Sequence, residues 1–344
     1  MSIRDKTTVD AEAKRPRVSR STGSTGSTAV HDREGVATDP RDLVRFSIPE
    51  FEYRPLGGAP SLRWPHSGWI AHPLPAGELT PANMIMLEFL HALSTAASRR
   101  NHHLLLAAGD DSGLRDIREL IGSSAVDAFV LATVTPHDPR IALLARRGIP
   151  FASFGRTEPG MPQSWVDIDN RTAVSSVTTG LIEQGHSSVA FLGYAPQGRW
   201  DVEREGGYQD ALISADLPTL AATPEPDGPA VQHAIDALLD ANRPPTAIVT
   251  GSDVLAAAVY AAAAQRGMHI GTDLAVTGFD GSLIGRMLTP ALTTLAVPTG
   301  DIAQRLVDRV LRELDEPSDE AGELIMPDLV LGASASLPGR TIVA

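Results

Sequence analysis

Two acidic residues, Asp167 and Asp169, stand two positions apart at the end of a predicted strand. Because alternate side chains of a strand point to the same face, the two carboxyl groups share one face. Carboxyl groups placed in this way could serve in acid–base chemistry, but no second catalytic group stands near them in the sequence. We therefore favour the simpler interpretation, a polar strand end that leads into a helix cap.

Further polar residues follow predicted strands at the points where helices begin. Asn170, Ser252 and Asp280 are of this kind, and Arg204 stands near the start of a predicted helix. Each has a structural explanation, because Asn, Asp and Ser commonly cap helices and arginines are mostly exposed. In parallel sheets, however, ligands bind beyond the carboxyl ends of the strands, so the same residues are candidates for a binding site.

The motifs of the common enzyme classes are missing from the sequence. It contains no GxSxG elbow, Walker loop, GxGxxG fingerprint or HExxH pair. Its ten histidines do not pair at metal-ligand spacing, and the absence of cysteine excludes a thiol nucleophile, a disulfide scaffold and a cysteine-bound metal. We therefore expect no catalytic residue, no metal and no cofactor, and the sequence predicts a protein that is not an enzyme.

The composition predicts a folded chain of two or three domains. With 344 residues, of which 42% are hydrophobic, there is enough apolar material for packed cores. The longest apolar run, residues 254–264, is too short to span a membrane. The N-terminus lacks the apolar stretch of a secretion signal. We therefore expect a cytoplasmic protein without a membrane partner.

The net charge of −13 is unevenly distributed along the chain. Residues 1–66 carry 11 Lys and Arg against 9 Asp and Glu, whereas the remainder carries 18 against 33. An acidic protein is a poor general binder of nucleic acid, but a small basic segment suits a local contact with DNA. An ordinary solvated tail would have the same composition.

From Ser67 onward, short apolar runs alternate with segments of helical periodicity. Helix signals include Asp138-Pro139, with Gly148 at the far end, as well as Asn170 and Ser252. Strands that alternate with helices predict βαβ units in parallel sheets, and there are too many units for one open sheet. We therefore expect two similar α/β lobes. The predicted strands are residues 68–74, 104–108, 128–132, 189–192, 247–250 and 274–278.

Motifs between residues 126 and 298 follow one another in the order of a known family. They are VDAFVLA (126–132), GIPFASFGR (148–156), VDIDNRTAVSSVTTGLIEQGHSSVAFLG (166–193), REGGYQDAL (204–212), AIVTGSDVLAAAV (247–259), DLAVTGFDG (273–281) and TPALTTLAVP (289–298). Each is weak alone, but together, in this order and at these separations, they resemble the LacI/GalR family of bacterial transcription regulators. The resemblance covers about four-fifths of the chain, from Ser67 to the C-terminus.

The resemblance implies an α/β fold, namely a two-lobed, type I periplasmic-binding-protein-like effector domain whose parallel sheets are flanked by helices. Residues 67–164 plus 297–324 would form the N-terminal lobe, and residues 165–296 plus 325–344 the C-terminal lobe. Such domains are usually dimeric and bind a small molecule, commonly a sugar, in the cleft between the lobes. The ligand-binding residues that the resemblance implies are Arg204, Asp280, Asp169 and Ser252, with Phe279 and Trp200 as candidates for an aromatic wall.

The first 66 residues resemble the DNA-binding head and hinge of the family only in part. Residues 1–50 would form a degenerate, α-helical helix-turn-helix head, and residues 51–66 the hinge. Pro16, Gly23 and Gly26 stand in or beside the expected helices, where a proline costs about 3 kcal/mol and a glycine about 1 kcal/mol. The residues that match DNA-contacting positions are Val18, Ser19, Arg20, Ser21 and Thr22 in the head and Tyr53, Leu62 and Arg63 in the hinge.

Two functions from different classes follow from the sequence. The first is a ligand-responsive transcription regulator, a repressor that binds operator DNA as a homodimer and holds a small molecule, a sugar, between its lobes. The alternative is an effector-only protein that keeps the small-molecule site, has lost specific DNA binding and acts through protein partners. The family resemblance favours the first, whereas the glycines and prolines of the head and hinge favour the second. An exported receptor of the same fold is disfavoured, because no secretion signal is visible.

Overall fold

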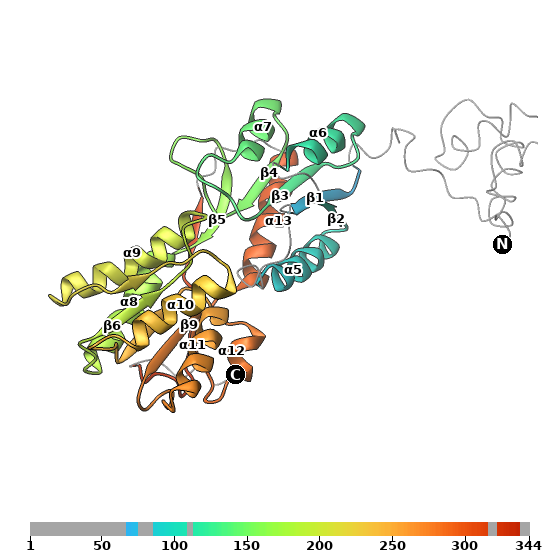
Figure 1. Ribbon diagram of the computed structural model, residues 1–344. Helices are drawn as coiled ribbons and strands as arrows, with labels where there is room; N and C mark the ends of the chain where they lie inside the picture. The colour runs from blue at the N-terminus through green and yellow to red at the C-terminus, as the bar shows by residue number, and fades with distance from the viewer. Residues whose placement is uncertain (1–66, 75–84, 109–112, 316–321, 338–344) are drawn as a thin grey trace, which may run out of the picture. The chain divides into compact units, whose positions relative to one another are not determined.

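The structure, a computed structural model, describes residues 67–74, 85–108, 113–315 and 322–337. The expected head and hinge, with all eight candidate DNA-contacting residues, lie outside these ranges. Gly68 begins the unit that holds every described helix and strand. Figure 1 gives the labels used below for these elements.

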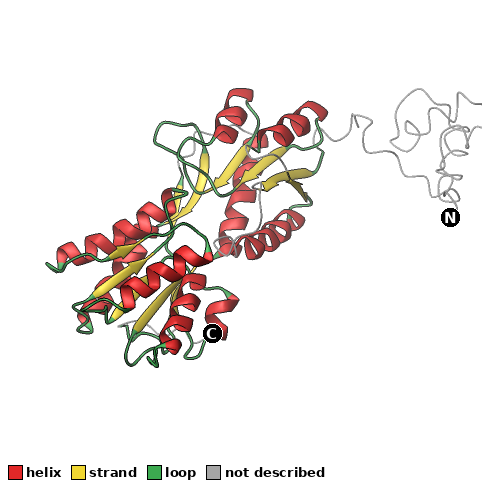
Figure 2. Cartoon of the chain, in the orientation of Figure 1, coloured by secondary structure: helices red, strands yellow, loops and turns green. Residues whose placement is uncertain are grey.

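Six strands form the first sheet, in the order β11-β5-β4-β3-β1-β2, and every pair is parallel. Apolar side chains such as Phe129 and Leu131 are fully buried, because helices pack against the sheet (Figure 2). The strands are β1 (Trp69–Leu74), β2 (His103–Ala108), β3 (Ala128–Leu131), β4 (Phe151–Phe154), β5 (Ser164–Ile168) and β11 (Glu323–Ile325). The helices around this sheet are α5 (Ile85–Arg99), α6 (Leu114–Ser123), α7 (Pro139–Arg147) and α13 (Thr299–Asp315).

The second sheet also has six strands, in the order β12-β10-β9-β8-β6-β7. All of its pairs are parallel except the antiparallel pair of β10 and β12. The strands are β6 (Val189–Leu192), β7 (Ala221–Ala222), β8 (Ala247–Thr250), β9 (Ala275–Asp280), β10 (Thr293–Ala296) and β12 (Asp328–Val330). The helices on this side are α8 (Asn170–Glu183), α9 (Arg199–Ser214), α10 (Gly228–Leu239), α11 (Asp253–Gln265) and α12 (Leu283–Met287). The predicted α/β architecture of two lobes with parallel sheets and flanking helices is thus confirmed.

The chain passes between the two sheets at three points: from β5 to α8, from β10 to α13 and from β11 to β12. The lobe boundaries drawn from the sequence at residues 164/165 and 324/325 cut through β5 and β11. Both strands belong to the first sheet, where Val166 pairs with Phe154 and Ile325 with Ile168. The ladder of backbone hydrogen bonds continues to these residues, so the division belongs after Ile168 and after Ile325.

Two helix caps predicted from the sequence are present. Asp138 caps α7, and the Ser252 hydroxyl accepts a hydrogen bond of 3.2 Å from the backbone N–H of Leu255 in α11. The cap predicted at Asn170 is wrong by one residue. Asp169 accepts a hydrogen bond of 3.1 Å from the backbone N–H of Thr172, and Asn170 is the first residue of α8. The amide of Asn170 is therefore available for contacts outside its own helix.

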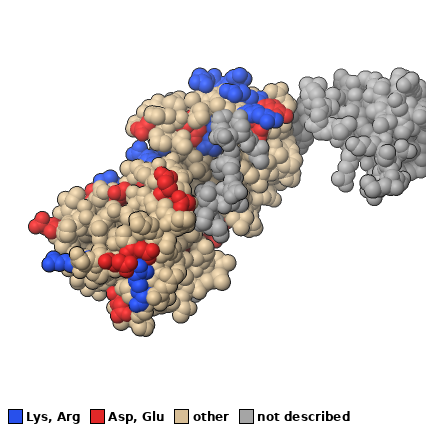
Figure 3. Space-filling view, viewed as in Figure 1, with Lys and Arg blue, Asp and Glu red and all other residues tan. Residues whose placement is uncertain are grey.

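One part of the described surface carries several basic side chains, although the chain as a whole is acidic. Basic side chains stand together over α6 and α7 in Figure 3. The exposed arginines of these two helices are Arg115, Arg118, Arg146 and Arg147. Within the residues that the structure describes, no helix has the length and apolar character that crossing a membrane requires.

Candidate functional site

A cavity of about 1070 Å³, counted with the part that is open to solvent, lies at the carboxyl ends of strands from both sheets. Residues that follow β3, β4 and β5 line it from one side, and residues that follow β6, β8 and β9 line it from the other. Parallel strands end at one edge of a sheet, so the side chains that follow them converge there. The polar lining residues are Thr133, Asp167, Asn170, Tyr194, Gln197, Asp201, Arg204, Ser252 and Asp280.

Arg204 is held rigidly in the wall of this cavity. Its Nε donates to the Asn170 Oδ1 at 2.8 Å, and one terminal nitrogen donates to the Gly251 carbonyl at 2.6 Å. Its guanidinium carbon lies 3.6 Å from the centre of the Phe279 ring. This placement depends on close packing of α9 on α8, because a Cβ at Gly207 would lie 2.2 Å from the Arg171 carbonyl oxygen. The side chain is therefore oriented before any ligand arrives.

Asp280 ends β9 beside Arg204 and takes a strained backbone conformation, with a φ of 109°. The next residue, Gly281, has a φ of 70°, and a Cβ there would lie 2.4 Å from that of Ala296. Burial raises the pKa of the Asp280 carboxyl to about 8; the negative charge of Asp253 adds to this rise, and the positive charge of Arg204 opposes it. The carboxyl group of Asp280 can therefore donate a hydrogen bond when it is protonated and accept hydrogen bonds when it is ionised.

The loop after Asp280 is held in place by Asp253, the first residue of α11. The carboxylate of Asp253 is fully buried and accepts hydrogen bonds from the Ser282 N–H at 2.6 Å and the Ser282 hydroxyl at 2.9 Å. It also accepts one from the Thr294 hydroxyl at 2.6 Å. Asp253 therefore positions Asp280 without lining the cavity itself.

The start of α9 supplies a second polar corner of the cavity. Asp201 accepts hydrogen bonds from the backbone N–H groups of Gln197 at 3.0 Å and Gly198 at 3.3 Å, so it closes the N-terminus of the helix. Burial raises the pKa of Asp201, although these hydrogen bonds and Arg204 oppose the rise. Trp200 lines the cavity next to it. Together they place an aromatic face beside hydrogen-bonding groups.

An ion pair joins the two lobes at the edge of the cavity. Arg156, which follows β4, contacts the Glu203 carboxylate on α9 at 2.5 Å, and Arg199 contacts the same carboxylate at 2.7 Å. Arg156 also lies 3.5 Å from Asp167 of β5. Burial raises the pKa of Asp167 to about 6, against the opposing effect of Arg156. The pair is a direct electrostatic contact between the first and second lobes.

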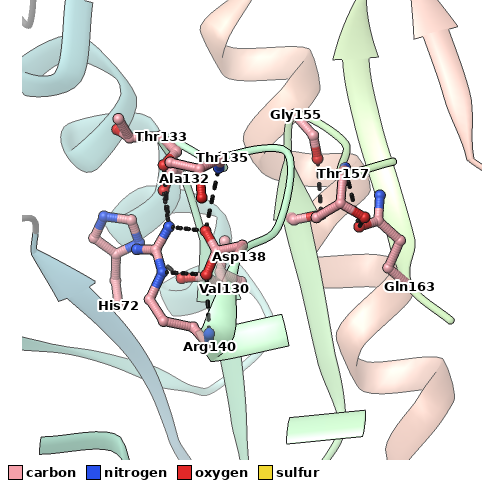
Figure 4. Close-up of polar contacts among 11 residues, drawn as sticks. His72, Val130, Ala132, Thr133, Thr135, Asp138, Arg140, Gly155, Thr157 and Gln163 are labelled. Carbon is pink, nitrogen blue, oxygen red and sulfur yellow. Dashed lines mark hydrogen bonds and ion pairs between the residues drawn. The ribbon is translucent and has the colours of Figure 1, made fainter. Parts of the chain in front are cut away.

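The loop after β3, which contributes Ala132 and Thr133 to the cavity, is fixed by a buried ion pair (Figure 4). Arg140 binds Asp138 at 2.6 Å and donates to the carbonyl groups of Ala132 at 3.0 Å and Thr133 at 3.1 Å. Burial alone would raise the pKa of Asp138, but the hydrogen bonds and charge of Arg140 hold it below the ordinary value. This side of the cavity is therefore also built on a rigid frame.

Four of the ligand-binding residues expected from the sequence lie together in the cavity wall: Arg204, Asp280, Ser252 and Trp200. Two do not. The side chain of Asp169 is used as the cap of α8, and Phe279 is fully buried beneath the guanidinium of Arg204 rather than lining the cavity. In the structure Asp169 caps a helix start and Phe279 supports Arg204, and a contact of either residue with a ligand stays a prediction.

Sequence reasoning missed several polar residues of the wall. Asp201 lies three residues before Arg204, a spacing that places both on one face of a helix and could have revealed it. The strand pattern around Asp167 indicates a carboxyl group beside that of Asp169 and gives no sign that it lines a cavity. No local pattern pointed to Tyr194, which reaches the site only through the fold. Among the described residues, no group of three or more His, Asp or Glu side chains is arranged to hold a metal ion.

Comparison with known proteins agrees with this architecture. The family of periplasmic binding protein-like domains matches residues 178–335. The crystal structure of a regulatory protein of LacI family from Chloroflexus aggregans is 30% identical, with a TM-score of 0.71, and the match covers 79% of this chain and 99% of that one. The HTH-type transcriptional regulator AglR of Rhizobium meliloti is 28% identical over 325 residues, 90% of each chain. A transcriptional regulator CelR–cellobiose complex shares the fold, with a TM-score of 0.70 and 22% identity over 95% of this chain and 99% of that one.

Two lobes of parallel sheets that meet at a polar cavity define a periplasmic-binding-protein-like domain. Within that class, the chain belongs to the LacI family of regulators. Its relatives are transcription regulators rather than enzymes.

Proposed function

We propose that this protein is a ligand-responsive transcription regulator, a repressor that binds operator DNA as a homodimer and a sugar in the cavity between its lobes. The observation that carries the proposal is the prearranged guanidinium of Arg204, which Asn170 and the Gly251 carbonyl hold beside Asp280. A guanidinium and a carboxyl group side by side suit neighbouring hydroxyls, which both donate and accept hydrogen bonds.

The surroundings of Arg204 support a sugar as the ligand. Trp200 and Phe154 offer aromatic surface to the apolar face of a sugar ring, and Tyr194 and Ser252 add hydroxyl groups. The CelR relative binds cellobiose. Closure of the lobes on the sugar would regulate DNA binding to the extent that the sugar binds one arrangement of the lobes more tightly than the other.

The homodimer is supported by apolar side chains that are exposed in the single chain. Leu87 of α5 is 72% exposed and Met287 of α12 is 74% exposed. Leu106, which is 47% exposed, stands on β2, the edge strand of the first sheet. A second copy of the chain would remove these side chains from water, which is favourable in proportion to the apolar area covered.

Binding to operator DNA rests on the family membership and on the partial match of the head and hinge. The alternative, an effector-only protein without specific DNA binding, is favoured by the helix-breaking residues of the head and the hinge. These are Pro16, Gly23 and Gly26 in the head and Gly57, Gly58 and Pro60 in the hinge. Both proposals share the same effector domain. Its lobes would consist of residues 67–168 plus 297–325 and of residues 169–296 plus 326–344.

Fluorescence anisotropy of the full-length protein with DNA from upstream of its own coding region separates the two. A regulator binds this DNA more tightly than random DNA, with a steep dependence on salt, and the Leu62→Ala variant binds it more weakly because it loses the side chain expected to enter the minor groove. Equal binding of upstream and random DNA by a folded dimer would favour the effector-only protein.

A further inference from the structure

The charges that line the cavity are unequal. Three carboxyl groups, those of Asp167, Asp201 and Asp280, line it together with one guanidinium, that of Arg204. Arg204 is the only cationic side chain among the described residues of the lining, since Arg156 lies outside it. Acidic side chains therefore outnumber basic side chains in the described lining.

Acceptors and carboxyl groups of the protein itself already surround the positive charge of Arg204. Its guanidinium donates to Asn170 and Gly251, and the carboxyl groups of Asp280, Asp201 and Asp167 act on it in decreasing order. Burial raises the pKa of Asp280 to about 8 and that of Asp167 to about 6, although Arg204 opposes the first rise and Arg156, 3.5 Å from Asp167, opposes the second. The described lining therefore holds no further cationic side chain that could bind an anionic ligand.

Side chains of the protein also cap the N-termini of the helices that begin at the cavity. Such N-termini are the usual alternative to cations for holding a phosphate or carboxylate. Here Asp169 caps α8, Asp201 closes α9 and Ser252 caps α11. Two of these three groups are carboxylates, so the chain places its own negative charge where an anionic ligand would otherwise be bound.

The remaining wall suits a ligand without charge. Asn170, Gln197, Tyr194 and Ser252 can each both donate and accept hydrogen bonds, and hydroxyl groups of a ligand can do the same. The apolar surface of Trp200 completes the arrangement. No part of the wall requires a charge on the ligand.

We propose that the cavity selects uncharged saccharides and rejects their phosphorylated and acidic counterparts. The proposal rests on the sugar-binding function proposed above and narrows it to one chemical class. The physical cause is repulsion from the carboxyl groups, together with the cost of removing an anion from water without a partner.

Matched pairs of probes test the proposal on the full-length protein. Trehalose is compared with trehalose 6-phosphate, glucose with glucose 6-phosphate and glucuronate, and cellobiose with cellobionate. The melting temperature is measured with each compound, and dissociation constants follow by calorimetry. We expect at least one uncharged member to raise the melting temperature and to bind at least about tenfold more tightly than its anionic partner, about 1.4 kcal/mol.

Variants then test whether charge is the cause. Asp201→Asn and Asp167→Asn keep the size of the side chain and remove its charge, so each is expected to narrow the difference between the two members of a pair. Asp227→Asn is the matched control, because Asp227 is an exposed cap of α10 that does not line the cavity. It should leave the difference unchanged.

The outcomes are distinguishable. An anionic sugar that binds as tightly as its uncharged partner, or more tightly, overturns the selection for uncharged saccharides while the sugar-binding function stands. An unchanged difference in both cavity variants overturns the electrostatic cause. No stabilisation by any of the compounds counts against the sugar-binding function itself, and the narrower proposal fails with it.

Discussion

The two sides of the cavity supply different kinds of contact. The second sheet and its helices bring most of the polar groups, among them Arg204, Asp280 and Tyr194. The first sheet and its helices bring mainly apolar groups such as Ile85 and Phe154, with Asp167 and Thr133 as their polar residues. Hydrogen bonds to a ligand are directional and need groups that are held in advance. Apolar contact is not directional and depends mainly on the area removed from water. The difference suggests that the second lobe recognises the ligand and that the first lobe covers it.

The hydrogen bonds and ion pairs that hold the lining residues in place differ between the two lobes in the same way. On the second side, Asp253 clamps the loop that carries Asp280, and Asn170 fixes Arg204. On the first side, the Asp138–Arg140 pair fixes backbone rather than a polar ligand-facing side chain. The ion pair of Arg156 and Glu203 connects the two sides. Substitutions at Arg204, Ile85, Asp280, Asp253 and Arg156 test this division of roles between the two lobes.

Replacement of Arg204 by Ala is expected to have the largest effect on ligand binding. The variant loses charge-assisted hydrogen bonds and leaves the Asn170 oxygen and the Gly251 carbonyl without their donor. Affinity for a saccharide that stabilises the wild type should fall by about 100-fold or more, roughly 3 kcal/mol, as measured by calorimetry.

Its counterpart on the first side is Ile85→Ala. That variant loses only part of an apolar contact, so its affinity should fall by less than about tenfold. Arg146→Ala, which changes an exposed residue of α7 away from the cavity, serves as the control. Equal losses for the Arg204 and Ile85 variants would contradict the division between recognition and cover.

Asp280→Asn is expected to change the pH dependence of stability. Burial holds the pKa of Asp280 at about 8 in the folded protein, against about 4 in an unfolded chain. The folded state then binds the proton more tightly, so the free energy of unfolding of the wild type falls as the pH rises from about 4 to about 8. The variant lacks this contribution, which amounts to a few kcal/mol at most.

Urea unfolding of the ligand-free protein between pH 5 and pH 8 measures the effect, and a flatter profile is expected for the variant. Asp227→Asn again provides the control, since it removes an exposed carboxyl group. If the wild type and Asp280→Asn show the same slope, Asp280 does not carry its proton to neutral pH.

Asp253→Asn tests whether ligand binding by the second lobe depends on the hydrogen bonds that Asp253 accepts. The amide can no longer accept all three hydrogen bonds from Ser282 and Thr294, and one donor is left facing an NH₂ group. The free energy of unfolding should fall by about 2 kcal/mol, and ligand affinity should fall with it as the loop of Asp280 loosens. Chemical unfolding and calorimetry measure the two quantities. A variant with unchanged stability and unchanged affinity would show that Asp253 does not position Asp280 for binding.

Arg156→Gln is expected to have the smallest effect, about 1 kcal/mol of stability, because Arg199 remains beside Glu203. Loss of the contact between the lobes should also increase the radius of gyration of the ligand-free protein in small-angle X-ray scattering. Arg171→Gln, which breaks the exposed pair of Arg171 and Asp210 within the second lobe, is the control. If the radius of gyration of Arg156→Gln equals that of the wild type, the ion pair of Arg156 and Glu203 does not hold the lobes together.

Local patterns were sufficient to predict much of the fold. The caps at Asp138 and Ser252 follow from residue type next to helical periodicity, because a cap satisfies backbone groups only two or three residues away. The alternation of strands and helices predicted two lobes. Family motifs placed Arg204 and Asp280 in the cavity, although a helix start and a strand end alone left both with a structural explanation.

Local patterns left two possible uses open for some side chains. Asp169 could cap α8 or face the ligand; residue type favoured the cap, and the hydrogen bond from the Thr172 N–H shows that it is formed. Phe279 could form an aromatic wall, but Arg204 lies over its ring. The cap at Asp169 is a contact over only three residues, whereas Arg204 and Phe279 are far apart in the sequence and meet only through the fold.

The elements, their order and the residue types at the carboxyl ends of the strands follow from the amino-acid sequence alone. Which of these side chains face the cavity and which support it follows from the packing of the folded chain. Arg156 meets Glu203, and Asp253 meets Thr294, across separations of 47 and 41 residues. No local spacing encodes such contacts, because they arise from the packing of α9 on α8 and from the order of strands in two sheets.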